Sequence, residues 1–191
     1  MPLADVKRVY DNKKEELQGL SFRINYEELD YKKIAKKIKT QTIKIKKLYP
    51  DAQIPFRGSE QAAGVDLYAY IKDGDGRPSI VTVTPHYTKM LDTGIAIEIP
   101  DGYFGLIAAR SGLATKQNLA PANKIGVIDS DYRASIKVAL HNHGDMLQII
   151  HDGDRIAQLI IMPYITPVFE EVEELNETKR GEGGFGSSGT K

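Results

Sequence analysis

Short β-prone runs, each closed by a turn signal, fill most of this chain from Thr42 onward. They are rich in β-branched and aromatic residues, and no long helix is predicted between them. Many short strands at fairly even spacing are typical of a sandwich or barrel, so the pattern predicts an all-β fold. The predicted strands cover residues 43–48, 65–71, 79–84, 94–99, 103–109, 135–142 and 155–162.

Turn signals separate these runs. Asp73, Gly74, Asp75 and Gly76 predict a hairpin, because aspartate and glycine tolerate the backbone angles that a tight turn requires. Three other segments combine glycine with aspartate, and each predicts a further turn. These segments are residues 100–102, 143–145 and 152–154.

Residues 1–41 differ from the rest of the chain, because they are highly charged and favour helices. Apolar residues at helical spacing predict two amphipathic helices, with Val6, Val9, Tyr10, Leu17 and Leu20 on the first and Leu29, Ile34 and Ile38 on the second. A run of eight lysines without an acidic residue covers residues 32–47. A solvated helix face explains this run most simply, and a phosphate-binding patch is the alternative.

Charge balance and residue usage limit the partners of the protein. The 191 residues contain 26 Lys plus Arg and 26 Asp plus Glu, so no net field attracts nucleic acid or a membrane surface. The absence of cysteine excludes disulfides and thiolate metal sites. No apolar run reaches the roughly 20 residues that span a bilayer, and the N-terminus does not resemble a signal peptide. We therefore expect a cytoplasmic protein, or one in the host cytoplasm or nucleus if the source is viral, without nucleic-acid or membrane partners.

Two segments place charged side chains at or near predicted strands. Arg110, Ser111 and Gly112 follow a predicted strand, and this combination either cradles an anion or forms a plain loop. Asp66 stands inside a predicted strand shortly after Gly64, a residue that indicates close backbone approach. The Asp66 carboxylate is therefore either paired within the protein or in contact with a hydrated metal ion.

Two further segments carry polar groups beside apolar runs. Asp129 and Tyr132 lie in the segment 126–133, which is typical of a hairpin turn whose aspartates cap backbone amides. The alternative is a carboxylate that orients water while the tyrosine packs on a ligand. Gln158 is the one neutral polar residue in an apolar run, and it is either buried and satisfied or directed at a ligand.

The segment 180–189 contains five glycines and cannot build a core. Its composition alone predicts a disordered tail. However, the Arg180 guanidinium can bind phosphate through two parallel hydrogen bonds, and the hydroxyls of Ser187 and Ser188 can donate to phosphate oxygens. Phe185 can stack on a base. The tail therefore has the parts needed to grip a nucleotide.

Five motifs occur in one order along the chain: AGVDLYA, ARSGLA, GVIDSDYR, GDRIAQLI and RGEGGFGSSG. Together they resemble the five ordered motifs of the homotrimeric dUTPases, and the similarity covers the chain from about Thr42 to its end. The resemblance implies a jelly-roll-like β domain of the β-clip type over residues 42–175 and a flexible lid over residues 176–191. It also implies a homotrimer in which three chains build each active site.

The family hydrolyses dUTP to dUMP and pyrophosphate with Mg²⁺ held by the triphosphate, which limits uracil in DNA and supplies dUMP for thymidylate synthesis. By this resemblance, Asp129 is the catalytic residue that deprotonates the water attacking the α-phosphorus. Tyr132 packs on the deoxyribose and excludes a 2′-hydroxyl, and Asp66 contacts the water shell of the magnesium. The remaining matched positions bind substrate: Arg110, Ser111, Gly112 and Gln158 the α- and β-phosphates, Asn123 to Gly126 the uracil edge, Arg180 the γ-phosphate, Phe185 the uracil ring, and Gly186, Ser187 and Ser188 the phosphates through the tail.

Two other interpretations compete with a dUTPase. The dCTP deaminases share the fold, but the glutamate that they require would stand at Ala139, and residues 135–142 contain no carboxylate. A dUTPase-like regulatory protein, whose N-terminal helices bind a protein partner, is the second alternative. Ala109 and Ala134 depart from the family pattern, which has proline and glycine there. If Ala134 needs a positive φ, the hairpin is strained by about 1 kcal/mol or more.

Overall fold

The computed structural model describes residues 42–181 and residue 183. Within this part of the chain, no helix is long and apolar enough to cross a membrane. The two helices expected in residues 1–41 lie outside the described residues, so they stay a prediction.

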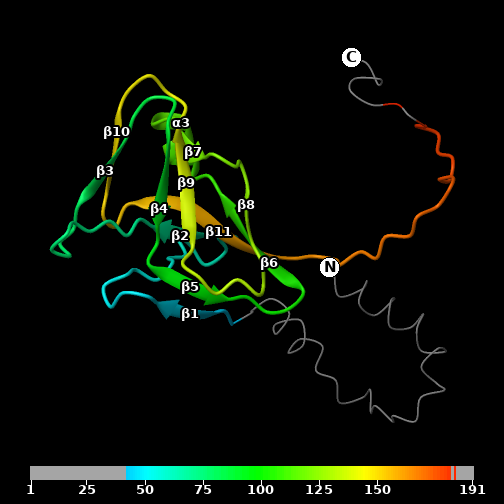
Figure 1. Ribbon diagram of the computed structural model, residues 1–191, viewed down its shortest axis with the longest axis horizontal. Coiled ribbons are helices and arrows are strands. Elements are labelled where there is room, and N and C mark those ends of the chain that lie inside the picture. Colours follow the sequence, from blue (N-terminus) through cyan, green and yellow to red (C-terminus); the bar gives the residue numbers. More distant parts are fainter. Residues whose placement is uncertain (1–41, 182, 184–191) are drawn as a thin grey trace, which may run out of the picture.

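Within residues 42–181, nearly all the regular structure is β-strand, apart from one six-residue helix, as the sequence predicts (Figure 1). In chain order the elements are β1 (Lys44–Lys47), β2 (Val65–Tyr68), β3 (Ile80–Val83), β4 (Thr88–Asp92), β5 (Ile95–Glu98), β6 (Tyr103–Ala108), α3 (Ser111–Lys116), β7 (Leu119–Pro121), β8 (Gly126–Ile128), β9 (Lys137–Asn142), β10 (Gln148–His151) and β11 (Arg155–Pro163).

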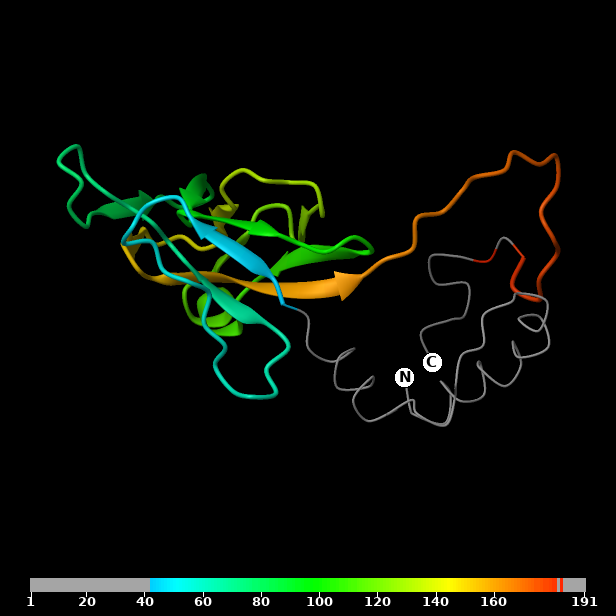
Figure 2. The same cartoon turned by 90° about the horizontal axis from the view of Figure 1, so that it is seen from below.

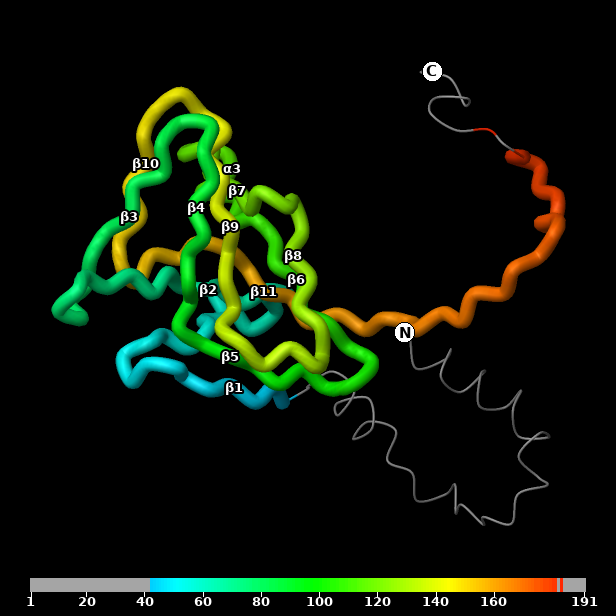
Figure 3. The backbone as a smooth tube through the Cα atoms, viewed as in Figure 1, coloured from blue at the N-terminus to red at the C-terminus, as the bar shows by residue number. Residues whose placement is uncertain are grey.

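These strands form four antiparallel sheets, and the chain crosses repeatedly between them (Figure 3). The largest sheet has the strand order β2-β11-β6-β8, and a second has the order β4-β9-β7. Two further sheets are pairs that join β1 to β5 and β10 to β3. No sheet in the described part of the chain closes into a barrel. Residues of all four sheets pack in one hydrophobic core, which includes Leu67, Val83, Ile97, Leu140 and Leu159.

Each of the seven predicted runs contains an observed strand, whereas β4, β7, β8 and β10 have no counterpart in the prediction. The local signals of these strands are weak, since β4 ends at Asp92, β7 ends at Pro121 and β8 begins at Gly126. They form because a stronger neighbour offers hydrogen bonds: β4 and β7 flank β9, and β8 pairs with β6. Tertiary pairing rather than intrinsic propensity therefore defines them.

The predicted turns form as expected. In the first hairpin, Asp73 Oδ1 accepts hydrogen bonds of 2.9 Å from the backbone amides of Asp75 and Arg77, and Gly76 has a φ of +77°. Gly153, between β10 and β11, has a φ of +82°. Ala134 is not among the residues with positive φ, so the strain considered for this position does not arise.

A charged cluster fixes the turn that leads into β11. Lys72 Nζ lies 2.8 Å from Asp51 Oδ2 and 2.8 Å from Asp152 Oδ2. The hydrogen bond to Asp152, and to a lesser extent the one to Asp51, raise the pKa of Lys72 above its usual range. Tyr70 donates to Asp51 Oδ1 at 3.0 Å and stacks on Tyr49 with ring centroids 4.4 Å apart. The cluster thus ties the connection between β1 and β2 to the β10–β11 turn.

After β11 the chain leaves its own domain. Figures 1 and 2 show residues 164–181 running away from the strands. Several of their apolar side chains are nearly fully exposed, with Ile165 at 88%, Val168 at 96% and Phe169 at 91%. Such exposure of large apolar side chains is costly, so the segment is suited to packing on another surface.

Gly94, directly before β5, is a position where only glycine fits. It has a φ of +67°, and an added Cβ would lie 2.9 Å from Ala52 Cβ and 3.0 Å from Tyr70 Cγ. We expect Gly94→Ala to destabilise the fold by about 3 kcal/mol, because backbone strain and overpacking add. Gly76→Ala is the control, since Gly76 has the same sign of φ but open space around it. Its expected cost is about 1 kcal/mol. Thermal unfolding of both variants measures the difference, and equal losses would contradict the packing argument.

Candidate active site

Asp66 on β2 holds two arginines. Its Oδ1 accepts a hydrogen bond of 2.9 Å from Arg110 Nε, and its Oδ2 accepts one of 3.0 Å from Arg155 Nη1. Arg110 Nη1 also donates to the Arg155 carbonyl oxygen at 3.1 Å. The carboxylate is largely buried, at 12% exposure. Asp66 is therefore paired within the protein, and each of its oxygens can accept a further hydrogen bond.

This arrangement orients the guanidinium of Arg110. Two of its three nitrogens are engaged, and Nη2 has no partner in the part of the chain that the structure describes. The cluster of two guanidiniums and one carboxylate carries a net positive charge at neutral pH. A guanidinium held in this way can donate hydrogen bonds to an anion.

Neighbouring predicted residues gather at the same end of the sheet. Gln158 on β11 pairs in register with Asp66 on one side and with Ala108 on the other. An added Cβ on Gly64 would lie 2.9 Å from Gln158 Oε1, so a side chain rather than backbone makes the close approach at this glycine. Ser111 and Gly112 are exposed and form the start of α3, so the segment is a short helix rather than a plain loop.

A second group of predicted residues lies on the hairpin after β7. The hairpin borders a pocket of about 150 Å³ at the point where β7 ends beside β9. An added Cβ on Gly126 would lie 3.0 Å from Ile107 Cβ and 3.5 Å from Asn123 Nδ2, so this glycine keeps the pocket open. The pocket is lined by Ile107, Pro121, Asn123, Gly126, Val127, Ile128, Lys137, Val138 and Ala139.

Asp129 and Tyr132 follow directly on this hairpin. Asp129 is exposed, and its carbonyl oxygen accepts a hydrogen bond of 3.2 Å from the Tyr132 amide. The Tyr132 hydroxyl donates to the Ser135 carbonyl at 3.0 Å, while the Ser135 hydroxyl bonds to the Asp92 carboxylate. These bonds hold the loop against β4, and among the described residues no side chain or amide bonds to the Asp129 carboxylate.

The two groups lie at opposite ends of β6. The register pairs Ile128 with Gly105, so Asp129 stands near the start of β6, whereas Arg110 follows its end. Six residues of strand span about 20 Å. The Arg110 side chain also reaches Asp66 on β2, on the side of β6 that faces away from β8. One triphosphate therefore cannot contact Asp129 and Arg110 of the same chain.

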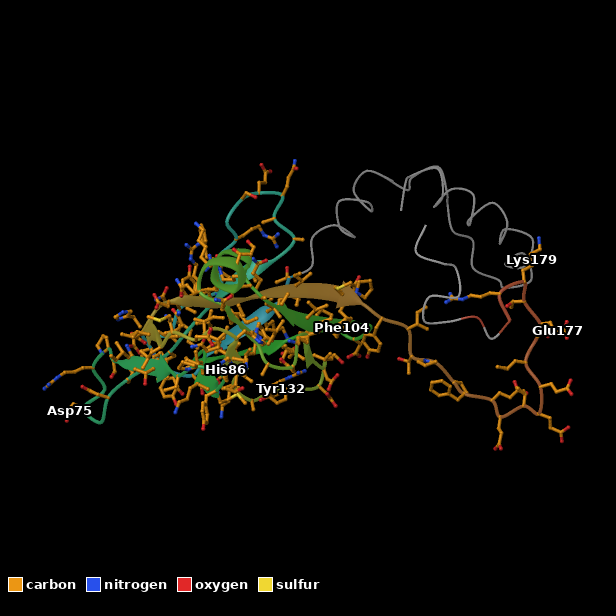
Figure 4. The ribbon with its side chains drawn as sticks, turned by 90° about the horizontal axis from the view of Figure 1, so that it is seen from above. Asp75, His86, Phe104, Tyr132, Glu177 and Lys179 are labelled. Atoms are coloured by element: carbon orange, nitrogen blue, oxygen red, sulfur yellow. The ribbon has the colours of Figure 1, made fainter. Side chains whose placement is uncertain are left out.

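The C-terminal motif begins where the described residues end. Arg180 is exposed, and its Nε donates to the Gly183 carbonyl at 2.7 Å. Figure 4 shows Glu177 and Lys179 on the same segment, well away from Tyr132 and Phe104 on the β domain. The other predicted residues of the motif, namely Phe185, Gly186, Ser187 and Ser188, lie outside the described residues.

The histidines do not form a metal site. No group of three His, Cys, Asp or Glu side chains in the described part of the chain could hold a metal ion. His141 and His143 contact each other edge to face, with ring centroids 4.4 Å apart. The pKa of His143 is lowered, mainly because burial disfavours its charged form and secondly because of repulsion from the neighbouring His141. A direct protein metal centre is therefore not supported by these residues.

Arg155 is the main site residue that the sequence prediction leaves without a role. It occurs in the quoted run GDRIAQLI, but nothing in the spacing connects it with Asp66, which is 89 positions away. The only local signal is an arginine that directly follows a Gly-Asp turn. The antiparallel pairing of β11 with β2 places Arg155 opposite Tyr68, which is two residues from Asp66, and so brings the side chains of Arg155 and Asp66 together.

Comparison of the sequence with known proteins finds a matching family model and similar proteins of one name. A dUTPase family model matches residues 50–189. The deoxyuridine 5'-triphosphate nucleotidohydrolase of Escherichia phage T5 is 49% identical over 150 residues, which cover 78% of this chain and 99% of that protein. The protein of the same name from Syntrophotalea carbinolica is 47% identical over 152 residues, covering 80% and 99%.

Solved structures agree with these relatives. A mutant dUTPase of Staphylococcus bacteriophage 80alpha, bound to dUpNHpp, has a TM-score of 0.68 and 30% identity, covering 78% of this chain and 99% of that chain. A mutant dUTPase from phage phi11 of S. aureus, in which a structural Mg(II) ion is coordinated, has a TM-score of 0.63 and 25% identity, covering 72% and 100%.

The Asp66 cluster makes a prediction about stability. We expect Asp66→Asn to lower the free energy of unfolding by about 2 kcal/mol, because two charge-assisted hydrogen bonds lose their acceptor charge in a largely buried place. Asp75→Asn is the control, since Asp75 pairs with Arg77 at 3.6 Å on the surface, and its expected cost is about 0.5 kcal/mol or less. Chemical denaturation compares the two variants. Similar losses would show that Asp66 anchors nothing.

Proposed function

This chain belongs to the dUTPase family and is an enzyme that hydrolyses dUTP, and we propose that Asp129 activates the water that attacks the α-phosphorus. The water oxygen bonds to this phosphorus, its proton passes to the Asp129 carboxylate, and the bond to the bridging oxygen breaks to release pyrophosphate and dUMP. The observation that carries this role is the position of Asp129, an exposed carboxylate fixed beside a small pocket by the Tyr132 and Ser135 hydrogen bonds.

Arg110 has the geometry of a phosphate ligand. The Asp66 carboxylate and the Arg155 carbonyl hold its guanidinium before substrate arrives, so little reorganisation is needed as charge develops on the phosphate oxygens. Gln158, Ser111 and Gly112 lie at the same end of the sheet, and we assign them to the α- and β-phosphates as well.

The pocket beside the hairpin suits the nucleoside. Asn123 and Gly126 line a space of about 150 Å³, which is suited to a single small ring. We assign the uracil to this pocket and the deoxyribose to Tyr132, whose ring is 40% exposed. Contact between that ring and the sugar leaves no room for a 2′-hydroxyl, which accounts for selection against UTP.

The residues fit a magnesium ion that the substrate holds. The described residues contain no cluster of three metal ligands, and Mg²⁺ commonly binds through substrate phosphates and keeps several waters. When bound, the ion neutralises charge on the triphosphate. Asp66 is the carboxylate beside the phosphate ligand Arg110, and its oxygens can still accept hydrogen bonds from waters of the ion.

A site shared between copies follows from the separation of Asp129 and Arg110. We propose a homotrimer in which Asp129 and Tyr132 of one copy face Arg110 and Gln158 of another. The exposed apolar segment after β11 supports contact between copies, and so does a groove of about 630 Å³ beside β1 that aliphatic side chains such as Ile45, Val65 and Ile161 line. Charges also match, because β1 is lysine-rich and residues 170–177 contain five glutamates.

Several assignments concern residues outside the described part of the chain. We propose that residues 176–191 close over the bound nucleotide as a lid, with Arg180 on the γ-phosphate, Phe185 on the uracil, and Ser187 and Ser188 on the phosphates. A partner-binding role for residues 1–41 stays a proposal, as does the supply of dUMP and the limitation of uracil in DNA.

Replacement of Asp129 tests the proposed base. We expect Asp129→Asn to bind dUTP but to lose about 10²–10⁴-fold in kcat, because the amide cannot accept the proton. Asp131→Asn is the matched control, an exposed carboxylate in the same loop, and it should keep activity within about twofold of wild type. Pyrophosphate release from dUTP, dCTP, dTTP and UTP with Mg²⁺ measures both activity and selectivity. Normal turnover by Asp129→Asn would refute the role.

Mixed oligomers test the shared site. Asp129→Asn chains and Arg110→Ala chains should each be inactive alone. After co-refolding at equal amounts, a site that joins Asp129 of one copy to Arg110 of the next is intact in about a quarter of cases, so about a quarter of wild-type activity should return. A mixture that stays inactive, although mass measurement shows mixed trimers, would mean that the two residues act within one chain.

A further inference from the structure

Lys137 is a charged residue on the wall of the small pocket, and the mechanism above does not use it. It opens β9 and lines the pocket together with Asn123, Gly126 and Ala139. Among the described residues that line this pocket, Lys137 alone carries a charge. Its side chain is exposed, so the ammonium group is accessible to a ligand.

The ammonium of Lys137 has no carboxylate partner in the described part of the chain. The register places Asp92 of β4 directly across from it. Asp92 accepts hydrogen bonds on its Oδ1 from the Gly94 amide, at 2.7 Å, and from the Ser135 hydroxyl. No ion pair in the described part of the chain joins Asp92 to Lys137, so the ammonium beside the pocket can donate to a ligand.

The backbone around Lys137 also faces the pocket. On this side of β9 the Ala139 carbonyl accepts a hydrogen bond of 2.7 Å from the Ala122 amide, and alternate residues of a strand direct their backbone groups to the same side. Lys137 is two residues from Ala139, so its backbone groups point to the same side of β9. The strand β7 pairs only with the other end of β9, from Leu140 to Asn142. The pocket wall at Lys137 therefore combines free strand-edge groups with a cationic donor.

From these observations we infer that Lys137 is a specificity-determining residue that donates a hydrogen bond to a carbonyl oxygen of the bound pyrimidine. This inference rests on the proposed function. An ammonium group has three donors and no acceptor, so it pairs with a carbonyl but not with an exocyclic amine. Uracil has carbonyls at positions 2 and 4, whereas cytosine has an amine at position 4. With its ammonium group at the edge of the base that carries position 4, Lys137 favours uracil over cytosine.

The test compares Lys137→Met with two other variants. Lys137→Arg keeps the charge, and Lys89→Met removes an exposed lysine whose side chain lies on the opposite face of the neighbouring strand β4. A charge-assisted hydrogen bond is worth about tenfold or more in binding. We expect the ratio of kcat/KM for dUTP to that for dCTP to fall about tenfold in Lys137→Met, and to change less than about threefold in the other two variants.

Binding measurements separate the base from the phosphates. Lys137→Met should weaken the affinity for dUMP about tenfold and leave the affinity for inorganic pyrophosphate unchanged. An unchanged dUTP-to-dCTP ratio would overturn the inference, and so would a loss of affinity for pyrophosphate, which would assign Lys137 to the phosphates. A melting temperature like that of the wild type shows that the variant is folded. Wild-type activity on dUTP is measured in parallel, so failure of the proposed function is seen independently.

Discussion

The antiparallel pairing of β6, with β11 on one side and β8 on the other, is the constraint on which the rest of the structure depends. The pairing with β8 sets the Asp129 loop at one end of β6, and the chain leaves the other end directly into Arg110. The pairing with β11 sets Gln158 beside Ala108, next to the arginine. One strand thus keeps a candidate base and a candidate phosphate ligand about 20 Å apart. This separation is the observation behind the proposal that each site is completed by another copy of the chain.

Charge pairs prepare the phosphate end of the sheet. Asp66 uses both carboxylate oxygens on arginines, and this removes most of the conformational freedom of Arg110 before any ligand is present. The Lys72 cluster acts one turn away, where it fixes the loop that leads to Arg155. In both cases the geometry is obtained by folding rather than at the moment of reaction, as electrostatic preorganisation requires.

Much of the site could be read from the sequence, because its residues stand in short, local patterns. Gly64 predicts a close approach, and Gln158 fills that space; the hairpin at Asp73 forms through its own carboxylate. Other features depend on distant partners. The pairing of Asp66 with Arg155 joins residues 89 positions apart, and strands such as β4 and β7 exist because β9 lies between them. No window of sequence contains these partners.

The sequence by itself determined the β class, the turns and the identity of the chemical groups, since alternation, glycine placement and residue type act within a few positions. Only the tertiary structure decided which groups meet. It paired Asp66 with two arginines, left Lys137 outside every ion pair of the described residues, and separated Asp129 from Arg110. The reason is that strand register and ladder order join residues far apart in the chain, and both are set by burial of the common core rather than by local preference.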